Sequence, residues 1–251
     1  MLGSELSVGS ANTSCMSDNR DRGTRLLSLA VHELRTPVSV VSGYLRMLVR
    51  HFGDTLTEQQ RKIIQESDRS CGNLSGLLAE LSDLANLEAG QVQFRRQRVP
   101  LVALIRGLAD EVTEGRDRGV SLDVRATDGE LEVIGDPDRL KAALNAVLTA
   151  TLRERAQPAT LIASCRAADT SEGRTAFVAI GEAGLVDTLV ANRSGSGESF
   201  DEYRGGLGFR LVIACRVLAA HGGRIFSPIA ERGRLAIVVS LPVAPGAQRA
   251  E

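Results

Sequence analysis

Residues 30–37 read Ala-Val-His-Glu-Leu-Arg-Thr-Pro and lie inside a stretch with the periodicity of an amphipathic helix. Between Thr24 and His51 the apolar residues recur at three- and four-residue steps, which predicts one helix with a single apolar stripe. Pro37 falls inside this helix and predicts a kink just after His32, because proline lacks an amide proton and clashes with the preceding turn. The pattern therefore places a histidine and a carboxylate side by side on a long helix.

A second long helix is predicted after a break at Gly53 and Asp54. The residues Thr57-Glu58-Gln59-Gln60 have the form of a capping box, with Thr57 as the N-cap. An apolar stripe at helical spacing follows, and Gly90 is the residue type that ends such a helix. Two helices with a short connection form an antiparallel hairpin, which needs a second copy to bury its stripe in a four-helix bundle.

The rest of the chain alternates between helical and strand patterns. Helices are predicted from Pro100 onward, after Asp136-Pro137 and over Gly208–Ala220. Strands are predicted at Val120–Val124, Glu130–Ile134, Thr160–Cys165, Ala176–Ile180, Arg224–Phe226 and Leu235–Leu241. The stretch Leu185–Gly206 is polar and rich in glycine, and we expect a long loop there. This alternation predicts an α+β domain.

The composition is that of an ordinary globular protein, with 43% hydrophobic and 24% charged residues. A formal net charge of -1 does not favour nucleic-acid binding. No apolar run is long enough for a membrane span, and residues 1–22 lack a secretory signal, so we expect a disordered leader and a cytoplasmic protein. The four cysteines are scattered without a CxxC pair, which argues against a metal or redox motif.

His32, Glu33 and Thr36 form the candidate catalytic group. A neutral imidazole has a nitrogen lone pair that can accept a phosphoryl group, and histidine is the side chain most often neutral near pH 7. Glu33 can hold the other ring N–H and support the positive charge that develops. Thr36 lies one helical turn further on, where its hydroxyl can orient a water molecule. On an arbitrary helix such a pair would be a surface feature without function.

The string from His32 to Pro37 resembles the phosphoacceptor box of two-component sensor histidine kinases, and the resemblance extends from about Leu26 to Val243. It implies a dimeric four-helix-bundle hairpin followed by a two-layer α/β sandwich of the histidine kinase ATPase (Bergerat) type. The implied parts are a disordered leader (1–22), the dimerisation and phosphoacceptor hairpin (23–92), a linker and helix (93–110), the ATPase-like domain (111–245) and a tail (246–251).

The resemblance also implies an activity and partners. His32 would be autophosphorylated from ATP and would pass the phosphoryl group to an aspartate of a response regulator receiver domain. Glu33 would support both steps, and Glu33 with Thr36 would support dephosphorylation of the regulator. The implied assembly is a homodimer, and a separate sensor protein is a further partner because the chain has no room for an input domain.

Two glycine-containing stretches resemble the nucleotide-binding boxes of the same family. The turn Gly206-Leu-Gly208-Phe209 leads into a helix, and such turns bring backbone N–H groups close to phosphate oxygens. The resemblance continues to His221, which matches a histidine with a structural, capping role in the family. The other box reads Glu182-Ala-Gly184-Leu-Val186 where the family has Asp-x-Gly-x-Gly. Glu182 would take the role of the acid that binds the adenine amino group, and Gly184 that of the first glycine.

The Mg²⁺ site departs from the family pattern. Ala150 stands where the family has its metal-binding asparagine, and Ala146 stands one turn earlier. Asn145 is a weak metal candidate, because it points about 100° away from that position on a helix. Three interpretations stay open: a kinase that uses ATP and Mg²⁺, a plain interaction scaffold, or a pseudokinase defective in ATP binding. The pseudokinase would act as a phosphotransfer relay, a response-regulator phosphatase or a heterodimer partner.

Overall fold

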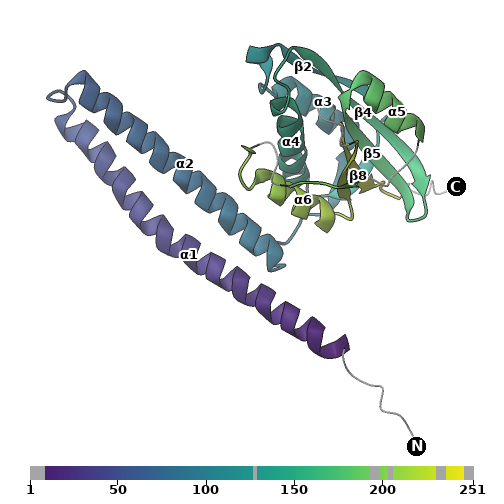
Figure 1. Ribbon diagram of the computed structural model, residues 1–251, viewed down its shortest axis with the longest axis horizontal. Coiled ribbons are helices and arrows are strands. Elements are labelled where there is room, and N and C mark those ends of the chain that lie inside the picture. Colours follow the sequence, from purple (N-terminus) through teal and green to yellow (C-terminus); the bar gives the residue numbers. More distant parts are fainter. Residues whose placement is uncertain (1–8, 127–128, 193–197, 203–205, 230–235, 246–251) are drawn as a thin grey trace, which may run out of the picture. The chain divides into compact units, whose positions relative to one another are not determined.

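The protein is described by a computed structural model that comprises two compact units, Met1–Val92 and Gln93–Glu251 (Figure 1). The residues that the structure describes are 9–126, 129–192, 198–202, 206–229 and 236–245. None of the helices in this described part of the chain combines the length and the apolar character needed to cross a bilayer.

The first unit is a helical hairpin of α1 (Gly9–Phe52) and α2 (Glu58–Glu88) (Figure 1). Its predicted capping box is confirmed. The Thr57 hydroxyl accepts from the Gln60 N–H at 3.3 Å, and the Gln60 side chain accepts from the Thr57 N–H at 2.9 Å. The predicted stop is also confirmed, since Gly90 follows the C-cap with a φ of 66°. The start and the end of α2 are therefore set by local contacts.

The expected disordered leader is wrong from Gly9 onward, because α1 begins there. Adding a residue to an existing helix forms one more hydrogen bond without a new nucleus, so a polar stretch can extend a helix that is already stable. The remaining leader residues, 1–8, and the expected tail, 246–251, lie outside the described residues.

The hairpin buries few side chains of its own. Its buried apolar residues are Val31, Cys71, Leu78 and Ala85. The large apolar side chains that the described residues leave most exposed lie on these two helices: Leu26, Leu29, Leu34, Val40, Val41, Tyr44, Met47, Leu48, Phe52, Ile63, Leu74 and Leu77. A hairpin with so much exposed apolar surface has the character of one half of a larger helical bundle.

The second unit contains a six-stranded sheet in the order β2-β4-β5-β8-β7-β6. The pair β2–β4 is parallel and the other pairs are antiparallel. The strands are β2 (Val120–Ala126), β4 (Ala159–Thr170), β5 (Gly173–Glu182), β6 (Glu198–Ser199), β7 (Arg224–Ile229) and β8 (Ala236–Pro242). The helical hairpin followed by a mixed α/β sheet domain confirms the expected fold class.

A separate two-stranded sheet pairs β1 (Gln97–Pro100) with β3 (Glu132–Gly135). The first of these strands lies where a linker was expected, and that expectation is wrong. The four residues of β1 show no alternation of apolar and polar residues, because only Val99 is buried, opposite the buried Val133. Pairing with β3, a predicted strand, supplies the hydrogen bonds that make this segment extended.

Helices cover both faces of the large sheet (Figure 1). On one face lie α3 (Leu101–Glu111), α4 (Pro137–Arg153) and α6 (Arg210–Ala220), and a short 3₁₀ helix (Arg116–Arg118) precedes β2. On the other face lies α5 (Ala183–Asn192), whose Val186 packs against Ile162, Ala179, Phe226 and Val238.

The helix α5 and the short strand β6 correct the expectation of one long loop over 185–206. Val186 is buried against the sheet, Leu189 packs partly buried against the same cluster, and Leu185 is buried as well; this burial outweighs the polar, glycine-rich composition of the stretch. Residues 193–197 and 203–205 of that stretch lie outside the described residues.

Candidate functional site

His32 and Glu33 lie in the middle of α1, with side chains that are 79% and 72% exposed. Their atoms Nδ1 and Oε1 are 3.5 Å apart. Because the carboxylate lies beside Nδ1, it favours a proton on that nitrogen and leaves the Nε2 lone pair facing solvent. The structure therefore places an accessible imidazole nitrogen beside an acid.

The packing of α1 explains this exposure. Val31 is 3% exposed and forms part of the hairpin core. Successive residues on a helix are about 100° apart, so His32 follows Val31 on the way to the outer face. Thr36 is exposed one turn after His32, as the sequence predicts. His51 also lies exposed on α1, near the helix end.

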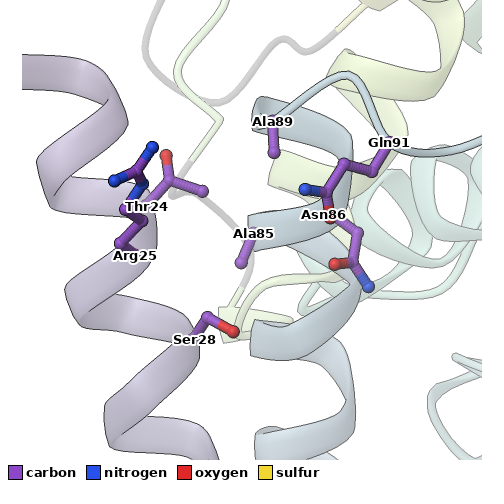
Figure 2. Close-up of a pocket in the computed structure, with 7 residues that line it drawn as sticks. All are labelled: Thr24, Arg25, Ser28, Ala85, Asn86, Ala89 and Gln91. Carbon is purple, nitrogen blue, oxygen red and sulfur yellow. The ribbon is translucent and has the colours of Figure 1, made fainter. Parts of the chain in front are cut away.

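A cavity of about 270 Å³ opens between the two helices at the base of the hairpin (Figure 2). Small side chains at Ser28, Ala85 and Ala89 leave this space, and Thr24, Arg25, Asn86 and Gln91 provide polar groups around it. None of the predicted site residues lines it.

The glycine turn that the sequence suggests as a phosphate site leads into the start of α6. Gly206 and Gly208 have φ values of 60° and 61°, a left-handed conformation that glycine adopts at little cost. The N-cap of α6 is Phe209, which offers no side-chain cap to the helix N–H groups. Arg153, at the end of α4, donates to the Gly206 carbonyl at 3.2 Å. This turn therefore fits phosphate oxygens.

Arg153 is held by Glu114, whose carboxylate accepts from Nη2 at 3.0 Å. Glu114 also accepts from Arg118 at 3.0 Å. Hydrogen bonds from Arg153 and Arg118 lower the pKa of Glu114 below its ordinary value. The ion-pair cluster anchors a guanidinium group beside the glycine turn.

The residues at the metal position do not fit Mg²⁺. Ala150 is fully buried and Ala146 is 7% exposed, and neither has an oxygen ligand in its side chain. Asn145 lies on the exposed side of α4, so the structure does not bring it together with that position. Within the described ranges, no group of three or more His, Cys, Asp or Glu side chains forms a metal-ligand cluster.

The residues at the adenine position fit only in part. Glu182 ends β5, and its side chain forms an ion pair with Arg155, which follows α4. Gly184 lies exposed in the first turn of α5. Val186 is 1% exposed and lies in the apolar cluster between α5 and the sheet. Its β-branched side chain restricts the backbone, so it cannot replace the second glycine of the family pattern.

His221 is buried and has a structural role. Its Nε2 accepts from the Asp136 N–H at 3.0 Å, and its Nδ1 lies 2.7 Å from the Val217 carbonyl, so the ring is neutral with the proton on Nδ1. The Phe94 ring meets it edge-on, with centroids 4.9 Å apart. The interpretation of His221 as a cap is therefore consistent with its contacts.

Asp136 caps α4, as predicted, by accepting from the Arg139 N–H at 3.2 Å. Burial raises the pKa of Asp136, but hydrogen bonds from the N–H groups of Arg95 and Arg139 outweigh this, and the pKa lies below its ordinary value.

Arg153 and Arg155 were missed by sequence reasoning. Their only local signal is their basic character near the end of α4, whereas their partners lie far along the chain.

Comparison with known proteins matches residues 24–90 to the His Kinase A (phospho-acceptor) domain. BaeS, a signal transduction histidine-protein kinase of Escherichia coli (strain K12), is 27% identical over 240 residues, covering 87% of this chain and 46% of BaeS. The sensor histidine kinase GacS of Pseudomonas protegens is 26% identical over 205 residues, covering 77% of this chain and 22% of GacS. The chain thus spans less than half the length of these relatives.

The fold is shared with the full-length ShkA crystal structure in complex with AMPPNP. The TM-score is 0.68 at 21% identity, covering 89% of this chain and 46% of ShkA. The matched phosphoacceptor domain contains His32, Glu33 and Thr36. The matched domain is thus the phospho-acceptor domain of histidine kinases, the relatives that the chain resembles over most of its length are histidine kinases, and ShkA shares the fold.

Proposed function

We propose that the chain is a histidine kinase that transfers the γ-phosphoryl group of ATP to His32 and then to an aspartate of a response regulator. The observation that carries this proposal is the exposed His32–Glu33 pair inside the matched phosphoacceptor domain. ShkA, which shares the fold, was crystallised with AMPPNP, and this supports ATP as the phosphoryl donor.

His32 acts as the nucleophile in this proposal. Its Nε2 lone pair forms the N–P bond while the bond between the γ-phosphorus and the bridging oxygen breaks, and ADP leaves. Glu33 holds the Nδ1 proton and balances the positive charge on the ring. The turn at Gly206–Phe209 binds phosphate oxygens through backbone N–H groups. Thr36 orients a water molecule when a phosphorylated regulator is hydrolysed.

The assembly we propose is a homodimer through the hairpin, because the exposed apolar side chains of α1 and α2 need cover. We place the phosphoacceptor hairpin at 23–92 and the ATPase-like domain at 111–245. A receiver domain and a separate sensor protein are the proposed partners, and the cytoplasm is the proposed location.

A second candidate is a pseudokinase in which His32 receives its phosphoryl group from a regulator or from another kinase. Three observations favour it: Ala150 is fully buried at the metal position, Glu182 is paired with Arg155, and Val186 is fixed on the opposite face of the sheet. Such a chain would serve as a relay, as a phosphatase or in a heterodimer.

Labelling with [γ-³²P]ATP and Mg²⁺ tests the first candidate. We expect acid-labile label on the wild-type chain, none on His32→Gln, and wild-type label on His51→Gln, which replaces another exposed histidine of the same helix. Label that survives in His32→Gln would contradict the proposal. A chain labelled only by a phosphorylated receiver domain, and not by ATP, would favour the second candidate.

A further inference from the structure

Arg155 and Glu182 form a partly buried ion pair between the end of α4 and the end of β5. The Arg155 side chain is 17% exposed and the Glu182 side chain is 37% exposed, and Nη2 of the first contacts Oε1 of the second. The carboxylate that would bind an adenine amino group in the proposed nucleotide site therefore already has a cationic partner.

The backbone of Arg155 is fixed in place. Its N–H donates to the Leu152 carbonyl at 3.2 Å, and its own carbonyl accepts from Arg118 Nε at 3.1 Å. Glu182 is equally constrained, because it pairs with Leu161 at the end of the β4–β5 ladder. These hydrogen bonds hold the backbone of Arg155 and the β-ladder holds that of Glu182, so the two side chains stay within reach of each other.

We propose that Arg155 determines the base specificity of the nucleotide site, by pairing with Glu182 and so suppressing recognition of adenine. This inference rests on the proposed function, because it assumes that the domain binds nucleotides. At position 6 of the purine ring adenine has an amino group, which donates to a carboxylate, whereas guanine has a carbonyl oxygen, which accepts from a guanidinium group. With Glu182 occupied, the chain binds nucleoside triphosphates mainly through phosphate contacts at Gly206–Phe209, and it does not prefer ATP over GTP.

The substitution Arg155→Gln releases the Glu182 carboxylate. A hydrogen bond to a charged acceptor then becomes available to adenine, which corresponds to about tenfold tighter binding. GTP bound in the same orientation gains nothing from this change, because guanine places its 6-carbonyl oxygen, an acceptor, against the carboxylate. The expected result is a gain of ATP affinity by a variant that loses an ion pair.

The experiment is a calorimetric titration of the full chain with non-hydrolysable ATP and GTP analogues. We expect similar affinities for both analogues in the wild type, about tenfold tighter ATP binding in Arg155→Gln, and loss of that gain in Arg155→Gln combined with Glu182→Gln. The matched control is Arg224→Gln, which breaks the exposed ion pair with Glu172 and should change neither affinity.

Glu182→Gln alone keeps the test valid if Arg155→Gln does not fold. We expect wild-type ATP affinity in this variant, because Glu182 does not contact the base when Arg155 holds it. Marked wild-type preference for ATP that Glu182→Gln abolishes would overturn the inference. An unchanged ATP affinity in folded Arg155→Gln, or no binding by any variant, would overturn it as well.

The outcomes separate this inference from the proposed function. Label on His32 from ATP, together with a loss of ATP binding in Glu182→Gln, would keep the kinase and reject the role of Arg155. Tighter ATP binding by Arg155→Gln without any label on His32 would keep the role of Arg155 and reject the kinase.

Discussion

Replacement of Gly223 by alanine tests the close packing between the end of α6 and β8. An added Cβ would lie 2.3 Å from the Ser240 carbonyl oxygen, 2.8 Å from Leu241 Cδ2 and 3.2 Å from the Leu218 carbonyl oxygen. Two of these three atoms belong to the backbone, so they cannot rotate away. Gly223 has no positive φ, and the whole cost is therefore steric. We expect the free energy of unfolding to fall by about 1–3 kcal/mol.

The matched control is Gly107→Ala in the interior of α3, where an added Cβ meets nothing within 4 Å. Because alanine favours a helix over glycine, we expect this variant to gain about 0.5–1 kcal/mol. Urea denaturation of the full chain, followed by circular dichroism, compares the two, and hydrogen exchange of the β8 amides assigns the change to this region. Wild-type stability in Gly223→Ala, or an equal loss in both variants, would refute the steric reasoning.

Three further predictions concern single side chains. Folding lowers the pKa of Glu114 below its ordinary value of 4.5. The carboxylate therefore contributes its full stabilisation at pH values above 4.5, and this stabilisation is lost as the pH falls through the lower pKa of the folded chain. Glu114→Gln should therefore be less stable than the wild type at neutral pH and converge with it in acid, and a constant difference in urea denaturation would contradict this. Burial raises the pKa of Cys165 to about 12, so iodoacetamide should leave it unmodified in the folded chain, as mass spectrometry of alkylated peptides can check. Thr57→Ala should cost the hairpin about 1 kcal/mol through loss of the capping box, measured by thermal denaturation, whereas an unchanged melting temperature would show that the cap is dispensable.

The features that the sequence predicts well depend on residues close together in the chain. The capping box at Thr57, the helix stop at Gly90 and the N-cap at Asp136 each involve contacts within a few residues. Such contacts form in the same way in most surroundings, so local residue patterns identify them. The pair of His32 and Glu33 belongs to this class, because adjacent residues on a helix need no tertiary fold to meet.

The features that the sequence does not predict depend on distant partners. The strand β1 forms because β3 supplies its hydrogen bonds, and α5 forms where burial of Val186 on the sheet outweighs a loop-like composition. The contact of His221 with Asp136 spans 85 residues. The ion pair of Arg155 with Glu182 likewise requires that α4 and β5 end side by side, which no local pattern indicates.

Locating the phosphoryl group on the chain tests the role of His32 directly. The full chain is incubated with ATP and Mg²⁺, digested at neutral to basic pH so that phosphohistidine survives, and analysed by tandem mass spectrometry. We expect a single phosphorylated peptide with the phosphoryl group on His32. Phosphate on another residue, or none on any peptide of a folded chain, would contradict it.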